Sequence, residues 1–200
     1  LTTTAYSENN MFKRCIVAVT LVAAAYGGEA KTLWSSYSVS YLRGNDYQAG
    51  DNSRSVVTFE YAATTSWGSS FMFFDRLESD NGDYETYGEF IPRFKLIDFH
   101  SSFVKNLYFV PSVEMVANAN VGNTNYLVGL GTDLDIRGFN YFQLNVFARN
   151  NDQGDNSWQT TVSWGLPLGT FYYDGFIDYA TRVKNLTPGV DRKTQMNFTS

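Results

Sequence analysis

Hydrophobic and polar residues alternate with a period of two along most of the chain after residue 30, and no segment there shows a helical period. This alternation predicts strands at 33–43, 54–63, 68–76, 86–96, 107–117, 125–135, 139–149, 157–166, 170–181 and 193–200. Most have the length, about nine to eleven residues, that a tilted strand needs to cross the hydrocarbon core of a membrane. The pattern therefore predicts an all-β, antiparallel transmembrane β-barrel.

Each predicted strand sorts into an apolar face and a polar face. In the first strand, Tyr37 and Val39 alternate with Ser36 and Ser38. The apolar faces are expected to meet lipid and the polar faces to line the lumen. The same alternation is found in four further sets, which are Val57/Phe59 against Thr58/Glu60, Val128/Leu130 against Gly129/Gly131, Leu144/Val146 against Gln143/Asn145, and Trp158/Val162 against Gln159/Thr161. The run 71–74 (FMFF) is apolar throughout, so its faces remain unassigned.

Connection lengths give a second signal. The long polar connections are 44–53, 77–85, 118–124, 150–156 and 182–192, and the short ones are 64–67, 136–138 and 167–169. If the first strand starts in the periplasm, the long connections fall outside and the short turns inside, which is the layout of bacterial barrels. Segment 97–106 is the exception, a long connection on the periplasmic side.

Aromatic residues lie near the strand ends, where they could form interfacial girdles. They are Trp34, Trp67, Tyr87, Tyr108, Trp158, Trp164 and Tyr179. Ordinary packing in a soluble β-sandwich is the alternative explanation for each of them.

Residues 11–30 have the pattern of a secretory signal peptide. Met11 is followed by two basic residues, an apolar stretch at 15–25 and small residues suited to cleavage before Lys31. Residues 1–10 are then expected to be an upstream remnant, and 31–200 the barrel. The alternative is an N-terminal core helix.

Composition narrows the possible functions. Aromatics make up 17% of the chain and charged residues 18%, which suits a membrane barrel. The net charge of −5 argues against a protein that binds nucleic-acid phosphates. The single cysteine, Cys15, lies in the predicted signal peptide, which excludes disulfides, cysteine-ligated zinc and a cysteine nucleophile from the mature chain.

A strand edge left open in lipid would leave backbone N–H and C=O groups without partners. The last predicted strand, 193–200, is short and has no terminal aromatic residue. We therefore expect the sequence to stop before the barrel closes.

Several segments resemble the nucleoside-specific channel-forming outer-membrane proteins, the family of Tsx and the OmpK-like porins. They are Phe59-Glu60-Tyr61, Trp67 leading to Phe74-Asp75, Glu89-Phe90-Ile91-Pro92-Arg93-Phe94, Gly129-Leu130-Gly131-Thr132-Asp133-Leu134-Asp135, and Asn145-Val146-Phe147-Ala148. The resemblance covers most of residues 34–200. It implies a barrel of about twelve strands, of which about ten are present and the C-terminal hairpin is missing. It also implies a bacterial outer-membrane location, facilitated diffusion of nucleosides, and outer loops that phages or colicins can use as receptors.

A nucleoside presents a flat base and a hydroxylated sugar, so a weak site for it needs aromatic faces and polar groups. The charged candidates, which match the family pattern and face the lumen by parity, are Glu60, Asp75, Glu89, Arg93, Asp133 and Asp135. The aromatic candidates, which face the lumen by parity, are Tyr141, Phe147, Tyr172 and Phe176. The alternatives are an ion-pair ladder that holds the barrel rigid, for Glu60, Glu89 and Arg93, and a structural role at the periplasmic rim, for Asp133 and Asp135.

Other chemistry has little support. His100 adjoins Ser101 and Ser102 only in sequence, which is no indication of a catalytic triad. Two carboxylates at Asp133 and Asp135 are a weak signal for a divalent cation. We therefore expect no enzyme activity, cofactor or metal. Pro92 in mid-strand predicts a bulge or kink.

Three functional hypotheses follow. The first is a channel for nucleosides or similar small solutes, with outer-membrane lipid around it. The second is a plugged structural or receptor barrel that acts through its extracellular loops. The third is a soluble periplasmic β-barrel binding protein. Small residues on the polar faces, such as Ser36, Gly131 and Gly165, favour the first because they leave space inside.

Overall fold

The computed structural model describes residues 30–47, 51–100, 103–120, 122–187, 190–192 and 194–199. The expected upstream remnant at 1–10 lies outside these residues, as does the expected signal peptide at 11–30 except for its last residue. Ser101 and Ser102 also lie outside them, and so do the two end residues of the strand predicted at 193–200.

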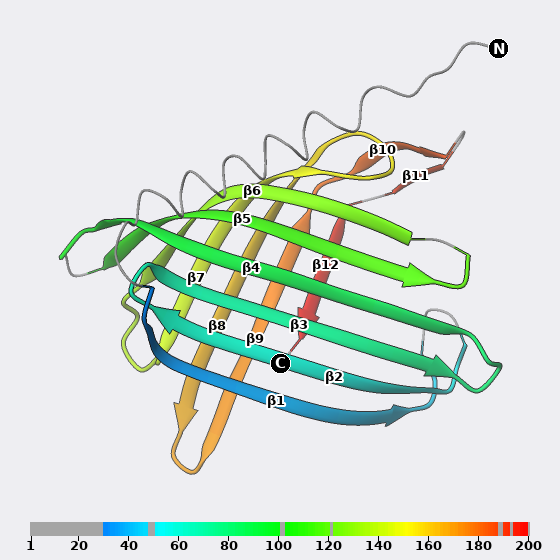
Figure 1. The fold of residues 1–200 in the computed structure, drawn as a ribbon, viewed down its shortest axis with the longest axis horizontal. Coiled ribbons are helices and arrows are strands. Elements are labelled where there is room, and N and C mark those ends of the chain that lie inside the picture. The colour runs from blue at the N-terminus through cyan, green and yellow to red at the C-terminus, as the bar shows by residue number, and fades with distance from the viewer. Residues whose placement is uncertain are drawn as a thin grey trace.

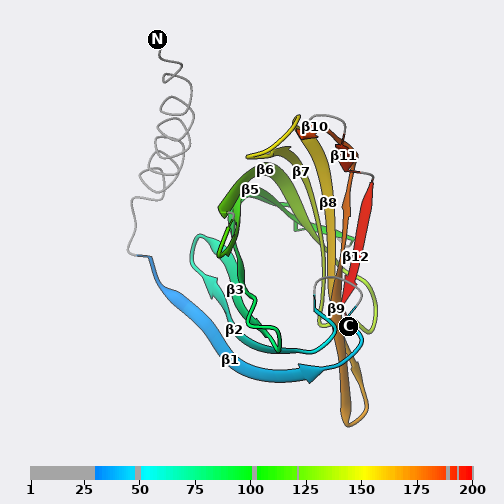
Figure 2. The same ribbon diagram turned by 90° about the vertical axis from the view of Figure 1, so that its right-hand side faces the viewer.

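Within the described residues, ten strands form one antiparallel sheet in the order β1-β2-β3-β4-β5-β6-β7-β8-β9-β12. The sheet curls into a half-barrel (Figures 1 and 2). The strands are β1 (Thr32–Gly44), β2 (Arg54–Thr65), β3 (Gly68–Ser79), β4 (Tyr84–Asp98), β5 (Val104–Asn118), β6 (Gly122–Leu134), β7 (Tyr141–Asn150), β8 (Ser157–Leu168), β9 (Phe171–Ala180) and β12 (Gln195–Thr199). The predicted all-β, antiparallel architecture is confirmed, and each strand of the main sheet overlaps one of the predicted segments.

The connections differ from the prediction in two ways. The strands run further than the alternation indicated, so two predicted long connections shrink to residues 80–83 and 119–121, and the irregular one to 99–103. The predicted connection at 182–192 contains a small hairpin of β10 (Val183–Thr187) and β11 (Val190–Arg192). The contrast between long and short connections is therefore weaker than the sequence suggested.

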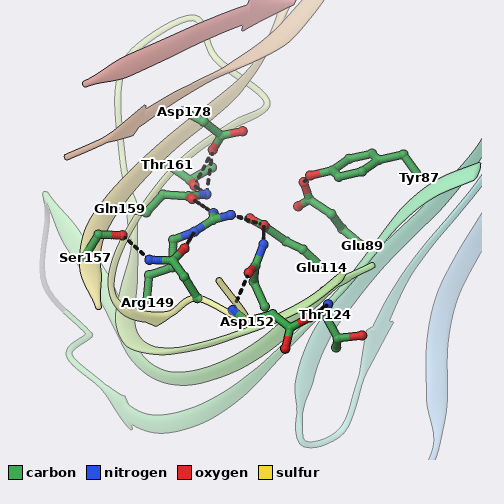
Figure 3. A network of polar contacts seen from close by, with 12 residues as sticks. Tyr87, Glu89, Glu114, Thr124, Arg149, Asp152, Ser157, Gln159, Thr161 and Asp178 are labelled. Atoms are coloured by element: carbon green, nitrogen blue, oxygen red, sulfur yellow. Dashed lines mark hydrogen bonds and ion pairs between the residues drawn. The ribbon is translucent and has the colours of Figure 1, made fainter. Parts of the chain in front are cut away.

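Strand register assigns every side chain to a face, because directly paired residues point to the same side of a sheet. One row across the sheet runs through Ser38, Glu60, Phe73, Glu89 and Glu114. The side chains of Glu89 and Glu114 point into the hollow of the half-barrel (Figure 3). This row defines the concave face.

The same register resolves the all-apolar run in β3. Phe71 pairs with Ala62 and Ile91, which share the face of Glu60 and Glu89. Phe71 therefore lies on the concave face together with Phe73. Their neighbours Met72 and Phe74 lie on the convex face.

The two faces differ in exposure. Apolar side chains on the convex face are open to the surroundings, such as Val57, Phe90, Leu130, Val146 and Trp158. The hydrophobic core lies on the concave face, where Val110, Leu127 and Phe147 are buried together with Tyr108. Among the described residues, no helix is long and apolar enough to cross a membrane.

The predicted bulge or kink at Pro92 takes another form. The register on either side of it is continuous and places Pro92 opposite Pro111, but the β4–β5 ladder has no paired positions from Ile91 to Arg93. Proline has no N–H to donate, so two facing prolines interrupt the ladder. The bulge itself lies further on, between Lys95 and Ile97.

Candidate functional site

Three aromatic side chains follow one another on the concave face of β3 and β4. Phe71 and Phe73 have ring centroids 6.0 Å apart, and Phe73 and Tyr87 have centroids 5.7 Å apart. All three keep part of their surface exposed. We call Phe71, Phe73 and Tyr87 the aromatic row.

Three carboxylates flank this row. Glu60 and Glu89 are the direct cross-strand neighbours of Phe73, on β2 and β4. Asp75 is two residues along β3 on the same face and pairs with Tyr87. We call Glu60, Asp75 and Glu89 the acidic strip.

Each carboxylate of the acidic strip accepts a hydrogen bond from a hydroxyl group. Ser38 Oγ donates to Glu60 Oε2 at 2.8 Å, and Thr58 Oγ1 donates to Asp75 Oδ1 at 2.6 Å. The Tyr87 hydroxyl donates to Glu89 Oε1. In the part of the chain that the structure describes, none of the three has a lysine or arginine partner.

A charged network covers the concave face further along the sheet (Figure 3). The Arg149 guanidinium, on β7, binds both carboxylate oxygens of Glu114 on β5, with Nη1 2.5 Å from Oε1. It also donates to Gln159, and its Nε donates to Asn151 Oδ1 at 2.8 Å. All four residues are buried. We call Glu114, Arg149, Asn151 and Gln159 the Arg149 network.

A second buried arginine, Arg93 on β4, has its own set of partners. Its Nη1 lies 2.6 Å from Asp133 Oδ1, and its Nε donates to Asn145 Oδ1 at 3.2 Å. The guanidinium carbon lies 4.1 Å from the centroid of the Tyr108 ring, and the Tyr108 hydroxyl donates to Asp133 Oδ2 at 2.6 Å. Arg93 and Asp133 thus form an ion pair, while Glu60 and Glu89 lie outside it.

The structure separates the two aspartates of the Asp133-x-Asp135 motif. Asp135 lies beyond the end of β6 and pairs with Lys105 at 3.3 Å. Among the described residues, no three His, Cys, Asp or Glu side chains are grouped so as to hold a metal ion. His100 is exposed, with Nδ1 3.4 Å from Asp98 Oδ1.

The four aromatic candidates occupy different places. Phe147 belongs to the buried core cluster. Tyr141 and Tyr172 both lie against Gly165, where a Cβ atom would meet the Tyr141 ring and the Tyr172 hydroxyl. Phe176 is half-buried on β9, paired with Ser163. Of these four, Tyr141 also lies within electrostatic range of Glu60 in the acidic strip.

Sequence reasoning did not single out Phe71, Phe73 or Tyr87 as site residues, although it noted Tyr87 as a strand-end aromatic. Glu114 and Arg149 also lie on the concave face, and sequence reasoning did not select them. Their pairing comes from strand register, since Glu114 and Arg149 lie on strands separated by β6. Alternation alone gives the face of a residue and not its neighbours two strands away.

One ion pair lies at the end of the half-barrel where β1 meets the 80–83 connection. Arg43 Nη2 lies 2.6 Å from Asp80 Oδ2, and both side chains are exposed. The hydrogen bond from Arg43 holds the pKa of the Asp80 carboxyl below its usual range.

The aromatic row and the acidic strip together offer flat apolar surfaces beside hydrogen-bond acceptors. Such a surface suits a flat ring that carries hydroxyl or N–H donors, because the ring can stack while its donors meet the carboxylates. No protein-family model, curated protein sequence or solved structure matches this chain.

Proposed function

We propose that the protein is a bacterial outer-membrane β-barrel that passes nucleosides or similar small solutes by facilitated diffusion. The observation that carries this proposal is the aromatic row with carboxylates on both sides, on the concave face of a curled antiparallel sheet. The exposed apolar residues of the convex face support a lipid-facing surface, as in transmembrane barrels.

The chemistry of the site fits transient binding. Stacking on Phe73 tolerates any base, because every base has a π face. The carboxylates of Glu60 and Glu89 can accept hydrogen bonds from ribose hydroxyls or from exocyclic amino groups. A site of this kind holds a solute weakly, which conduction requires. The family resemblance of the sequence supports the nucleoside in particular.

A receptor barrel with a filled interior is a second candidate. The Arg149 network and the Phe147 cluster occupy the concave face of β5 to β8 and reduce the open space there. Residues 51–53 and the 80–83 connection are also tied together, since Asp80 N donates to Ser53 O at 3.1 Å and Asn81 N to Asp51 Oδ2 at 3.2 Å. Surface segments that are held together in this way suit recognition by a phage or colicin.

Solute flux into liposomes that carry the protein separates these candidates. Adenosine is compared with a smaller monosaccharide, and empty liposomes give the background. Faster adenosine uptake that saturates with concentration supports the proposed channel. Uptake rates that follow the size of the solute alone indicate a general pore. No uptake of either solute favours the receptor barrel.

Membrane insertion needs its own measurement. An outer-membrane barrel depends on detergent for solubility and changes its gel mobility on heating. A protein that stays soluble without detergent and has one mobility would instead support a soluble periplasmic binding protein.

A further inference from the structure

The carboxylates of the concave face are partnered differently on the two sides of the half-barrel. On β5 and β6, Glu114 and Asp133 are each neutralised by a buried arginine. On β2, β3 and β4, the acidic strip accepts hydrogen bonds only from hydroxyl groups, which carry no charge. No described arginine or lysine pairs with the acidic strip, although Arg54 lies on the same face of β2 as Glu60.

Glu89 is the most buried member of the acidic strip. It is only 9% exposed, and the Tyr87 hydroxyl is its one hydrogen-bond donor among the described residues. Its carboxylate therefore keeps acceptor capacity on the second oxygen. Its side chain points into the hollow toward the Arg149 network (Figure 3).

The charges that face Glu89 do not compensate it. Glu89 lies within electrostatic range of Glu114, Asp178 and Arg149, which bring two further carboxylates and one guanidinium. Asp178 on β9 accepts hydrogen bonds from Thr161 Oγ1 at 2.5 Å and Gln159 Nε2 at 3.3 Å, again from uncharged groups. Carboxylates thus outnumber guanidinium groups at this level of the interior.

We propose that the acidic strip selects solutes by charge, so that the interior favours organic cations and disfavours anions of the same size and shape. This inference rests on the proposed channel function and adds a specificity to it. A concave surface lined by charge of one sign concentrates ions of the opposite sign, and rings of carboxylates make pores cation-selective.

The aromatic row narrows the preferred class to flat or quaternary organic cations. Phe73 lies between Glu60 and Glu89 in one row of the sheet. A cation over an aromatic face is attracted by the ring quadrupole, and flanking carboxylates add to this attraction. A flat anion would stack equally well but would meet carboxylates on both sides.

Uptake of two permanently charged aromatic solutes tests this selectivity. Liposomes carrying the protein are offered benzyltrimethylammonium or benzenesulfonate, which have similar size and opposite charge, with adenosine as the neutral reference. We expect the cation to enter about ten-fold faster than the anion, in line with the local concentration that such a field produces. Equal rates, or faster entry of the anion, would overturn the inference.

The variant pair Glu60→Gln/Asp75→Asn tests the assignment to the strip. Its control, Glu78→Gln/Asp83→Asn, removes the same number of charges from exposed positions at the strand ends and in the 80–83 connection. We expect the first pair to reduce the ratio of cation to anion uptake several-fold and the control to leave it unchanged. Equal effects of the two pairs would assign the selectivity to net charge and not to the strip.

Ionic reversal potential provides a readout that needs no aromatic solute. In a planar bilayer under a KCl gradient, the protein is expected to give a cation-selective reversal potential that Glu60→Gln shifts toward zero. Glutamine keeps the acceptor for the Ser38 hydroxyl, so this variant is expected to retain the local geometry. A protein that passes adenosine but conducts cations and anions equally would overturn this inference and leave the proposed channel function standing. A protein without conductance or flux would overturn both.

Discussion

Arg149 on β7 binds both carboxylate oxygens of Glu114 on β5, reaching across the intervening strand β6. Both side chains are buried, at 8% and 5% exposure. A bidentate pair of this kind ties three strands together with two parallel charge-assisted hydrogen bonds. It links β5 to β7 at the place where Gln159 and Asn151 also converge on Arg149.

Breaking this pair from one side is expected to be costly. Arg149→Met leaves the Glu114 carboxylate buried without a charged partner, which destabilises by about 3–5 kcal/mol. The double variant Arg149→Met/Glu114→Leu is expected to lose less than the single one, because no isolated charge remains. The free energy of unfolding in detergent, measured by urea titration, checks both values. If the double variant is less stable than Arg149→Met, the Glu114–Arg149 pair contributes more to the free energy of unfolding than the avoidance of an isolated buried charge.

Two glycines on the concave face of β6 are expected to respond differently to alanine. A Cβ at Gly129 would run into the backbone carbonyl oxygen of Val146, which the β6–β7 ladder holds in place. A Cβ at Gly131 would meet the side-chain oxygen of Asn145, which can rotate away at the loss of its bond to Arg93. Gly129→Ala is therefore expected to destabilise by about 1–3 kcal/mol, and Gly131→Ala by less.

Thermal unfolding of the two alanine variants side by side measures this difference. The glycines are two residues apart on the same face, so each serves as the control for the other. A larger loss for Gly131→Ala would mean that the Asn145–Arg93 bond matters more than the close approach of the backbones.

The faces of most strands could be predicted from alternation, because a half-buried sheet separates apolar from polar residues at every second position. Glu60, Glu89 and Arg93 were correctly expected to share a face. The run 71–74 defeated this reasoning, since four apolar residues carry no alternation. Only the register with β2 and β4 places Phe73 beside Glu60 and Glu89.

Partners and strand ends depend on information that alternation does not contain. Nothing in the sequence pairs Arg149 with Glu114 or Arg93 with Asp133, because the residues of each pair lie 35 and 40 positions apart. The sequence predicted that β3 ends at residue 76 and that β4 begins at residue 86, because Glu78, Tyr84 and Glu85 are polar or lie in a polar segment. In the structure, the ladder between the two strands continues into this segment, where both faces of a strand can meet water.

The Arg43–Asp80 pair predicts a pH response at one end of the half-barrel. Its hydrogen bond lowers the pKa of Asp80 from the usual value, about 3.9. A lowered pKa means that the pair contributes stability above the ordinary carboxyl pKa and loses it as the pH falls through the lowered one. Carbon-13 NMR titration of the Asp80 carboxyl is expected to show a midpoint below the usual value, and Arg43→Met to raise it. A midpoint that Arg43→Met leaves in place would contradict this assignment.

Adjacent phenylalanines on opposite faces of β3 offer the sharpest test of the candidate site. Phe73 lies in the aromatic row, whereas Phe74 lies on the convex face, where its ring covers Gly88. Truncating an aromatic ring that stacks on a base costs about 1–3 kcal/mol of binding free energy, which corresponds to roughly 5- to 150-fold in affinity. Phe73→Ala is therefore expected to raise the half-saturating adenosine concentration for liposome uptake by a factor in that range.

Phe74→Ala removes the same ring from the neighbouring residue, so it controls for lost volume and for lost strand propensity. We expect it to leave half-saturation unchanged and to weaken the β3–β4 packing, because the ring over Gly88 has no replacement. Equal shifts in half-saturation for the two variants would mean that uptake depends on the stability of β3 and not on stacking. A Phe73→Leu variant separates these causes further, since leucine restores apolar volume but offers no aromatic face. If stacking holds the solute, Phe73→Leu retains stability but shares the weak half-saturation of Phe73→Ala.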